Sequence, residues 1–364
     1  MRFFLIISSV LAVAACASDD DVPTSSGAGG AEATGGTVGA GGAPGPGGME
    51  ATGGMEATGG EEAAGGAPGM GGEPVGAGGE MEGELFHYVV PGDVVDPAIE
   101  EFTQPNYVYR DTRVAAQNRA LVFLPGSNGN PERLQRFLET AAGVGLHTIG
   151  LKYNNRPSLA ALCGGQAPEC FEQTRLDIIY GNGERVDRAH SIVNRVVKLV
   201  EHLHREHPDQ GWGQYVADGA PVWEKFVFAG HSQGGGHVAL IARDHVIHRA
   251  VMLNSPSDTG GSGTPAPYID DPHLTPSSAY YAFIHWDNGG PGRVMVYALL
   301  GMDAFGAPVN VDENAPPYDG SHVLFTALES ENPHGSVIAD ALVPVVDGQP
   351  VYAPAWAYIV GDGE

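Results

Sequence analysis

The chain has 364 residues, of which 54 are glycine, 44 are acidic and only 18 are lysine or arginine, so its formal net charge is −26 at pH 7. Phosphate groups would be repelled by such a chain, which argues against nucleic acid or an anionic lipid surface as a partner. The sequence contains no H-E-x-x-H motif or comparable metal-ligand spacing. We therefore expect neither a metal ion nor a cofactor.

The first sixteen residues have the pattern of an export signal. Arg2 supplies a positive charge, residues 3–13 form an apolar run too short to span a bilayer, and the segment ends in V-A-A-C at Cys16. This ending resembles the lipobox of bacterial lipoproteins, which implies a signal peptide over 1–16 and lipidation of Cys16. The protein would then be lipid-anchored in the cell envelope, at the outer membrane or cell surface. An ordinary cleaved signal peptide is the alternative.

Residues 17–84 form a segment that we expect not to fold. The segment is rich in Gly, Ala, Thr, Pro and Glu, has no aromatic residue, and repeats the letters G-G-M-E-A-T at Met49 and Met55. Its apolar side chains are too few to offset the entropy of ordering the chain, so a flexible tether is predicted. Over 85–364 aromatic and branched aliphatic residues recur, and this length suits one domain.

Hydrophobic patterning after residue 85 predicts strands that alternate with helices. Such alternation is typical of an α/β fold with a mostly parallel central sheet and helices on both faces. Residues 154–183 between these elements are expected to be irregular. The predicted strands are 86–90, 107–110, 120–125, 147–153, 226–229, 250–253, 280–285 and 322–328, and the predicted helices are 132–143, 184–207, 237–245, 294–301 and 354–360.

Two cysteines lie within the segment expected to be irregular. Cys163 and Cys170 are separated by six residues. In an oxidising compartment outside the cytoplasm, this pair predicts a disulfide that closes a short loop. A metal-binding pair is the alternative, but the spacing is too wide for a zinc knuckle and no second pair follows.

The pentapeptide G-H-S-Q-G at 230–234 follows the apolar strand predicted at 226–229 and precedes a stretch that can form a helix. A G-x-S-x-G motif in this context is typical of a nucleophile elbow, a sharp and strained turn that presents a serine at the top of a sheet. Glycines two residues on either side avoid collisions with the flanking strand and helix. Ser232 is therefore the predicted nucleophile, with a structural glycine-rich turn as the alternative.

These features resemble the α/β-hydrolase family over nearly all of 85–364, with site residues in the order Ser…Asp…His. The chain is also similar to a group of secreted bacterial α/β-hydrolases. The resemblance implies an α/β-hydrolase fold and a serine-dependent mechanism, and it leaves the substrate open. The shared motifs are L-P-G at 124–126, G-H-S-Q-G-G-G-H at 230–237, S-P-S-D-T at 255–259 and N-P-H-G-S at 332–336.

A serine hydroxyl needs a general base at neutral pH, and the chain has 14 histidines. His334 follows the last predicted strand and should reach back over the carboxyl edge of the sheet, so it is the predicted base. His322 begins that strand and should lie at the opposite end. His231, His237 and His245 belong to the serine turn and its helix, where packing or surface roles are expected.

The acid that orients the histidine has two candidates. Asp287 follows the strand at 280–285, two strands beyond the elbow, which is the usual position in the family. Asp258 follows the strand at 250–253 and is the alternative. Asp303 and Asp319 are weaker candidates and are expected to be solvated loop carboxylates.

An oxyanion hole needs two backbone N–H groups. One is expected from Gln233 at a helix N-terminus, where the dipole favours an anion. The other is expected from the loop after the strand at 120–125, with Ser127 as the first candidate and Asn128 as the second. The chain lacks the H-G-G turn common in the family, but backbone donation does not depend on the side chain.

These assignments predict acyl transfer through an acyl-enzyme, with a small-molecule or polymeric ester as substrate and a monomeric protein. Tyr153, Trp212, Tyr215 and Trp286 are expected to line the substrate pocket, with core or lid packing as the alternative. A non-catalytic binding module on the same scaffold and an acyltransferase are the alternative functions.

Overall fold

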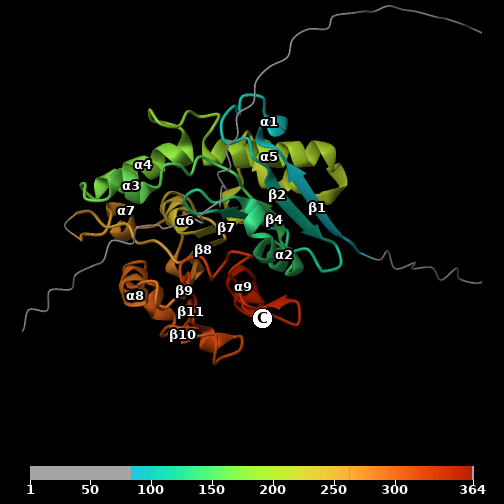
Figure 1. The fold of residues 1–364 in the computed structure, drawn as a ribbon. Helices are drawn as coiled ribbons and strands as arrows, with labels where there is room; N and C mark the ends of the chain where they lie inside the picture. Colours follow the sequence, from blue (N-terminus) through green and yellow to red (C-terminus); the bar gives the residue numbers. More distant parts are fainter. Residues whose placement is uncertain (1–82, 262, 363–364) are drawn as a thin grey trace, which may run out of the picture. The chain divides into compact units, whose positions relative to one another are not determined.

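The computed structural model describes residues 83–261 and 263–362 (Figure 1). The expectations for the export signal, for lipidation of Cys16 and for the tether at 17–84 fall outside these residues, apart from the last two positions of the tether. No helix within the described ranges is both long and apolar enough to cross a bilayer. The first regular element of the described residues is strand β1 (Leu85–Val90).

A nine-stranded sheet forms the centre of the described residues. Its strands are β1 (Leu85–Val90), β2 (Asn106–Asp111), β3 (Ala120–Leu124), β4 (His147–Gly150), β7 (Phe226–His231), β8 (Arg249–Leu253), β9 (Tyr280–His285), β10 (Val309–Asn310) and β11 (Val323–Thr326). They lie in the order β1-β2-β4-β3-β7-β8-β9-β11-β10. β2 is antiparallel to both of its neighbours, and every other pair is parallel. The carboxyl ends of the parallel strands therefore share one edge, where open α/β sheets bind ligands.

Helices and short hairpins connect these strands. The hairpins pair β5 (Val216–Ala217) with β6 (Ala220–Pro221) and β12 (Val345–Val346) with β13 (Gln349–Pro350). The α-helices are α1 (Gly92–Val95), α2 (Gln135–Gly143), α3 (Leu159–Cys163), α4 (Glu169–Tyr180), α5 (Ile192–Glu206), α6 (Gln233–Asp244), α7 (Pro267–Asp270), α8 (Gly290–Leu299) and α9 (Ala353–Val360). Short 3-10 turns lie at Pro131–Arg133, Pro208–Gln210, Trp212–Tyr215, Trp223–Lys225, Ser277–Ala279, Met302–Phe305 and Tyr318–Gly320.

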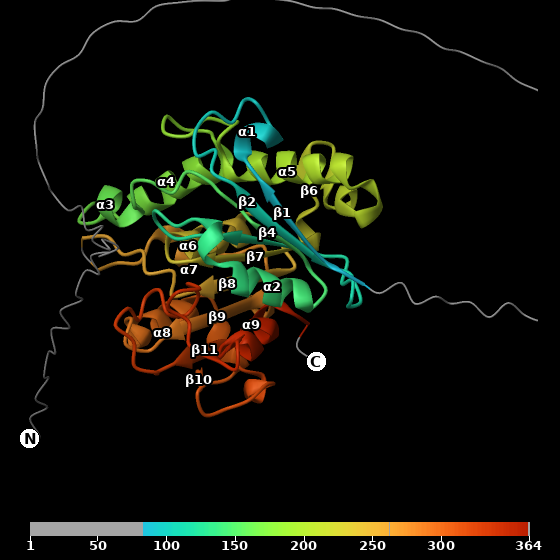
Figure 2. The same ribbon diagram turned by 45° about the vertical axis from the view of Figure 1, so that its right-hand side comes forward.

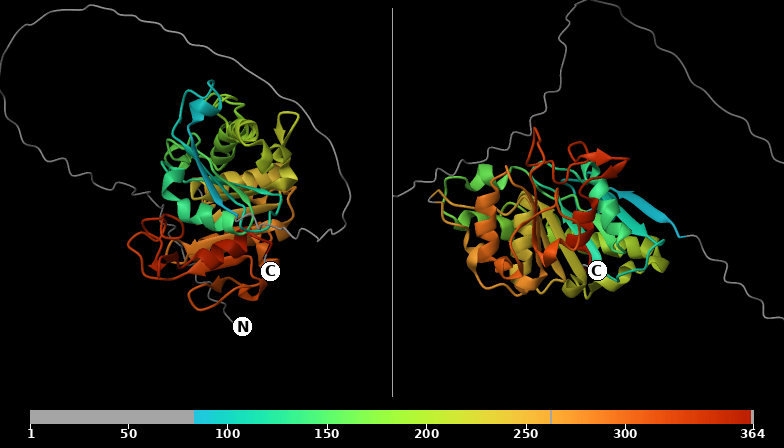
Figure 3. Two further views of the ribbon diagram at one scale, coloured as in Figure 1. Left: turned by 90° about the vertical axis from the view of Figure 1, so that its right-hand side faces the viewer. Right: turned by 90° about the horizontal axis from the view of Figure 1, so that it is seen from below.

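Helices cover both faces of the sheet. Along β3, Val122 belongs to one apolar cluster and Phe123 to the other, as the two-residue period of a strand requires. Helices α4, α5 and α6 contribute to the first cluster, and α2 and α9 contribute to the second. Figure 2 shows α2 and α9 on one side of the sheet, and Figure 3 shows the same layers from the side and from below. All five residues of β3 are buried, which explains their uninterrupted apolar run.

The predicted class, an α/β protein with a mostly parallel sheet between helices, is confirmed. The prediction that residues 154–183 are irregular is wrong, because α3 and α4 occupy much of this segment. Helix α4 buries three polar side chains together with its apolar ones, and this mixture hides the helical period. The three are Thr174, Arg175 and Asp177.

Two helix starts also differ from the predictions. The helix predicted from residue 184 begins at Ile192, because the Ser191 hydroxyl accepts a hydrogen bond from the N–H of Asn194 and caps it. The helix predicted from residue 237 begins at Gln233. Glycines 234–236 lie inside that helix because close packing leaves no space for side chains; a Cβ on Gly235, for example, would lie 1.7 Å from Ser255 Oγ.

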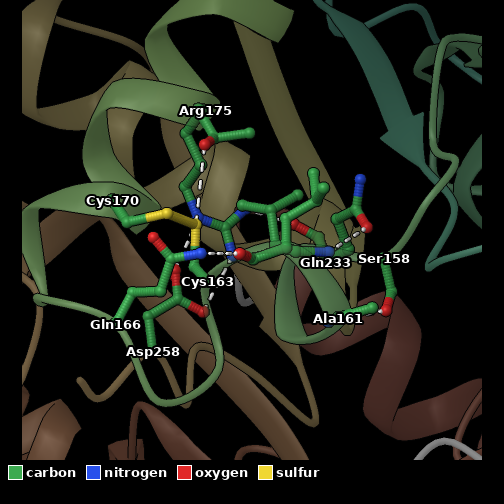
Figure 4. Close-up of a disulfide and its surroundings, with 11 residues drawn as sticks. Ser158, Ala161, Cys163, Gln166, Cys170, Arg175, Gln233 and Asp258 are labelled. Carbon is green, nitrogen blue, oxygen red and sulfur yellow. Dashed lines mark hydrogen bonds and ion pairs between the residues drawn. A yellow bond between two sulfur atoms is a disulfide. The ribbon is translucent and has the colours of Figure 1, made fainter. Parts of the chain in front are cut away.

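The structure joins Cys163 and Cys170, whose Cα atoms lie 5.6 Å apart, as predicted. This disulfide connects the last residue of α3 to the first turn of α4. Figure 4 shows the bond beside Arg175 and Gln233. It therefore fixes the helix pair that packs against the start of α6.

Candidate active site

Ser232 occupies the turn between β7 and α6. Its backbone angles are φ 53° and ψ −120°, a combination that L-amino acids rarely adopt. Its N–H donates to the carbonyl of Leu253 at 3.0 Å, so the strained turn is fixed to the end of β8. Ser232 is partly exposed, and its Oγ has no hydrogen-bond partner among the described residues. The turn therefore presents a free hydroxyl at the carboxyl edge of the sheet.

Close contacts require the glycines around Ser232. A Cβ on Gly230 would lie 2.4 Å from the carbonyl carbon of Gly234, and a Cβ on Gly234 would lie 1.9 Å from the carbonyl oxygen of Leu124. The collisions predicted at these two positions are therefore confirmed. A Cβ on Gly126 would lie 3.0 Å from that of Ser232. The loop after β3 is thus packed directly against the serine.

His334 lies on the loop that follows β11. Its ring centroid is 4.6 Å from that of His231, the residue before Ser232. Its Nδ1 lies 2.9 Å from Oδ1 of Asn288. Because an amide oxygen can only accept, Nδ1 carries the hydrogen and Nε2 keeps its lone pair. This is the tautomer that a general base needs.

The backbone of His334 is held by two side chains. His231 Nε2 donates to the His334 carbonyl at 2.8 Å, and Asn254 Nδ2 donates to the same oxygen at 2.9 Å. Asn254 follows β8 with a left-handed φ of 48°, and its Oδ1 accepts the N–H of His285 at 2.9 Å. One amide therefore connects the ends of β8 and β9 to the histidine loop.

The side chain that contacts His334 is Asn288, not the predicted acid Asp287. His285 fixes the turn after β9, because its Nδ1 accepts the N–H of Asp287 at 3.2 Å and its carbonyl accepts the N–H of Asn288 at 3.0 Å. In this turn Asp287 is exposed and Asn288 reaches the imidazole. The described contacts thus place the residue after Asp287 against the imidazole.

The alternative acid, Asp258, is engaged elsewhere. Its carboxylate accepts hydrogen bonds from Arg175 Nε at 2.6 Å and Nη2 at 3.0 Å, and from the Tyr268 hydroxyl at 2.8 Å. Arg175 also donates through Nη1 to the Gln233 carbonyl at 2.6 Å (Figure 4). The buried pair of Arg175 and Asp258 thus supports the first turn of α6. The carboxylate of Asp258 makes no hydrogen bond to His334.

Both histidines at the site are neutral at pH 7. The pKa of His334 lies well below the ordinary 6.5, because burial disfavours the imidazolium and because Arg293 and a protonated His231 would repel a second positive charge. Burial also lowers the pKa of His231 to about 4, although the hydrogen bond to the His334 carbonyl opposes this shift. A neutral His334 is ready to accept a proton.

The predicted oxyanion donors are neighbours. The N–H groups of Gln233 and Ser127 have no acceptor among the described residues. Ser127 Oγ donates to Gln233 Oε1 at 2.8 Å, which fixes the loop after β3 to the start of α6. The second candidate, Asn128, uses its N–H in a 3.2 Å bond to the carbonyl of Asn155. The geometry therefore favours Ser127 over Asn128.

Three of the four aromatic residues predicted to line a pocket are core residues. Trp212 and Tyr215 are fully buried and pack on His147 at the start of β4, which is the opposite end of the parallel strands. Tyr153 is also buried, and its hydroxyl donates to the carbonyl of Pro125 in the loop after β3. Trp286 alone of the four is partly exposed and lies beside the turn that carries Asn288.

Sequence reasoning missed three residues that build the site. Asn254 and Asn288 follow strands that were predicted correctly, so polar residues at strand ends were an available signal. Arg175 gave no such signal, because a single arginine in a stretch expected to be irregular does not reveal a buried partner 83 residues away.

No protein-family model matches the chain, and a search of curated proteins found no significant match. The fold and the site geometry are therefore the basis for an assignment of function.

We expect Gly234→Ala to destabilise the protein by about 3 kcal/mol or more, because the new Cβ would overlap the carbonyl oxygen of Leu124. Urea unfolding measures this change. Gly143→Ala is the control, since a Cβ there meets no atom within 4 Å and should be neutral or slightly stabilising. Equal stability of the two variants would contradict the packing described for the turn.

We expect Asp258→Asn to lower the free energy of unfolding by about 3–5 kcal/mol, because it leaves the buried guanidinium of Arg175 without its counter-charge. Asp287→Asn should change stability by less than about 0.5 kcal/mol, since this side chain is exposed. Denaturation curves of both variants check the difference. A larger loss in Asp287→Asn would show that its carboxylate has a partner that the structure does not contain.

Proposed function

We propose that the protein is a serine hydrolase that cleaves carboxylic esters, with Ser232 as nucleophile and His334 as general base. The observation that carries this proposal is the strained turn at Ser232. The turn presents a free hydroxyl one residue after His231, whose ring lies 4.6 Å from that of the neutral His334, and the N–H groups of Gln233 and Ser127 are unused among the described residues. Strain of this kind persists only where surrounding contacts enforce it, and it is concentrated at functional sites. A structural turn would need neither the strain nor the two free donors.

The groups of the site fit a two-step acyl transfer. His334 Nε2 takes the proton of Ser232 as Oγ attacks the ester carbonyl, and the N–H groups of Gln233 and Ser127 stabilise the oxyanion. Collapse of this intermediate breaks the ester bond, and His334 returns the proton to the leaving alkoxide. Water then attacks the acyl-enzyme with His334 again as base, which releases the acid and restores Ser232.

Asn288 takes the place of the acid in this proposal. Its Oδ1 accepts the Nδ1 hydrogen of His334 and so keeps Nε2 free for the serine proton. Unlike a carboxylate, it adds no negative charge next to the imidazolium that forms during the reaction. We infer a Ser232–His334–Asn288 triad in which the third residue orients the base through a neutral hydrogen bond.

Strand order supports the assignment to the α/β-hydrolase fold. The antiparallel pair β1 and β2 forms one edge of the sheet, and the strands from β4 to β10 in the order of the sheet are parallel to one another. The serine turn follows β7, in the middle of the sheet. The order Ser232, Asn288, His334 along the chain is that of the family resemblance, with Asn in place of Asp. We also propose that the enzyme acts outside the cytoplasm, as a lipoprotein anchored through Cys16. The pairing of Cys163 with Cys170 suits that compartment.

We expect Ser232→Ala to abolish hydrolysis of p-nitrophenyl esters and to prevent labelling by a fluorophosphonate probe, because both reactions need Oγ. A panel of acyl chain lengths on the wild type defines the preferred ester. The control is Ser257→Ala, an exposed serine on the loop after β8, which should keep full labelling. A folded wild type that neither labels nor hydrolyses any ester would favour a binding module, and product formed only with added alcohol or amine would favour an acyltransferase.

The lowered pKa of His334 predicts activity that persists in acid. The base works in its neutral form, so kcat/KM should be at its plateau at pH 6.5 and should fall only at lower pH. Asn288→Asp should move this acidic limb upward by about one unit or more, because an adjacent carboxylate favours the imidazolium. pH–rate profiles of both proteins test this expectation. An unchanged limb in Asn288→Asp would remove Asn288 from contact with the base.

A further inference from the structure

A small cavity lies against the loop that carries Ser127. Its volume is about 80 Å³, and it is lined by Phe102, Gln104, Asn130, Lys152 and Arg156. A water molecule in the liquid occupies ~30 Å³, so the cavity has room for a group of a few heavy atoms. No residue of the proposed triad lines it.

Lys152 gives this cavity an unusual charge. Its side chain is buried, with 3% relative exposure, yet no carboxylate among the described residues pairs with it. Its ammonium donates instead to neutral oxygens: the Gly129 carbonyl at 3.2 Å, Asn130 Oδ1 at 2.8 Å and, more weakly, Asn155 Oδ1 at 3.4 Å. Lysine is rarely buried without an anion, because its desolvation is then not compensated.

Two arginines add positive charge around Lys152. Arg156 is exposed, and its guanidinium has no hydrogen bond or ion pair with any residue that the structure describes. Arg195 is buried and donates to backbone carbonyls, among them those of Phe102 and Lys152. Burial, Arg156 and Arg195 together lower the pKa of Lys152 to about 8. The cluster is conspicuous in a chain with 44 acidic and 18 basic side chains.

We propose that this cavity binds a small oxyanion, a carboxylate or a phosphate group, between Lys152 and Arg156. The ammonium, whose three N–H groups already donate to Gly129, Asn130 and Asn155, supplies a fixed positive charge in the cavity wall. The guanidinium offers a planar donor pair at the rim, and this combination suits an oxyanion. An anion there supplies the counter-charge that no described residue provides at this position. The group is either part of the substrate or a free anion.

The contacts of the cavity reach the oxyanion hole. Lys152 Nζ and Asn155 Nδ2 both donate to the Gly129 carbonyl, and Asn155 Nδ2 also donates to the Gly126 carbonyl at 2.8 Å. Gly126 is the residue that packs against Ser232. Residues 126–129 are therefore held by the same groups that line or adjoin the anion cavity. The proposal that the anion affects catalysis rests on the proposed hydrolase activity. The proposal that the cavity binds an anion does not depend on that activity.

Binding is tested with inorganic phosphate and with acetate by isothermal titration calorimetry on the full mature chain. We expect saturable binding that weakens about tenfold or more in Arg156→Gln, the loss of roughly one charge-assisted hydrogen bond. Arg185→Gln is the matched control, because Arg185 is equally an exposed arginine whose guanidinium has no partner in the described ranges. No binding to the wild type, or equal binding to Arg156→Gln, would overturn the proposal. Lys152→Met provides a second variant if it folds.

The source of the anion is tested with two esters of equal chain length, p-nitrophenyl hexanoate and the p-nitrophenyl monoester of adipic acid. A substrate carboxylate predicts a higher kcat/KM for the charged ester, loss of that preference in Arg156→Gln, and competition by phosphate against the charged ester only. A free anion predicts that phosphate changes hydrolysis of the neutral ester. If no ester is cleaved while phosphate still binds, the hydrolase proposal fails and the anion site remains.

Discussion

The close approach of α6 to the end of β3 is the constraint on which the site depends. The turn at Ser232 is possible only because Gly234 lets the helix backbone reach the Leu124 carbonyl without an intervening Cβ. The same approach places Gly126 against Ser232 and brings Ser127 within hydrogen-bond distance of Gln233. One steric condition therefore aligns the candidate nucleophile with both candidate oxyanion donors, and the strained φ of Ser232 is its local cost.

The second constraint is electrostatic, and it explains why the carboxylate of Asp258 contacts Arg175 and not His334. An aspartate at a strand end has at least two physical uses, to orient a histidine or to neutralise a buried cation. Asp258 serves the latter, since Arg175 occupies both of its oxygens and extends to the Gln233 carbonyl. Its contribution to the proposed reaction is thus indirect, through the position of α6.

Much of the fold could be predicted from the sequence, because strands buried on both faces are uninterrupted apolar runs, as in residues 120–124. The candidate serine and histidine could also be predicted, since each depends on local sequence and on one topological rule. The partner of the histidine could not, because a one-residue choice between Asp287 and Asn288 depends on which backbone N–H the His285 ring accepts. Helix α4 was missed for a related reason: its buried Arg175 and Asp177 are stabilised by partners that its own sequence does not contain.

These features give the site one electrostatic character. His334 has a neutral partner, and Arg293 lies close enough to lower its pKa. Lys152 holds the neighbouring loop and has no counter-ion among residues 83–261 and 263–362. Such surroundings disfavour the imidazolium but favour negative charge on a carbonyl oxygen held by the N–H groups of Gln233 and Ser127. In the proposed reaction the imidazolium of His334 and the oxyanion of the substrate form together. Positive surroundings therefore destabilise the imidazolium but stabilise the oxyanion, and the two effects on the transition state offset each other. An anion bound beside Lys152 would weaken this positive field. The rate of the proposed reaction would then depend on the charge of the bound anion as well as on how well the anion fits the cavity.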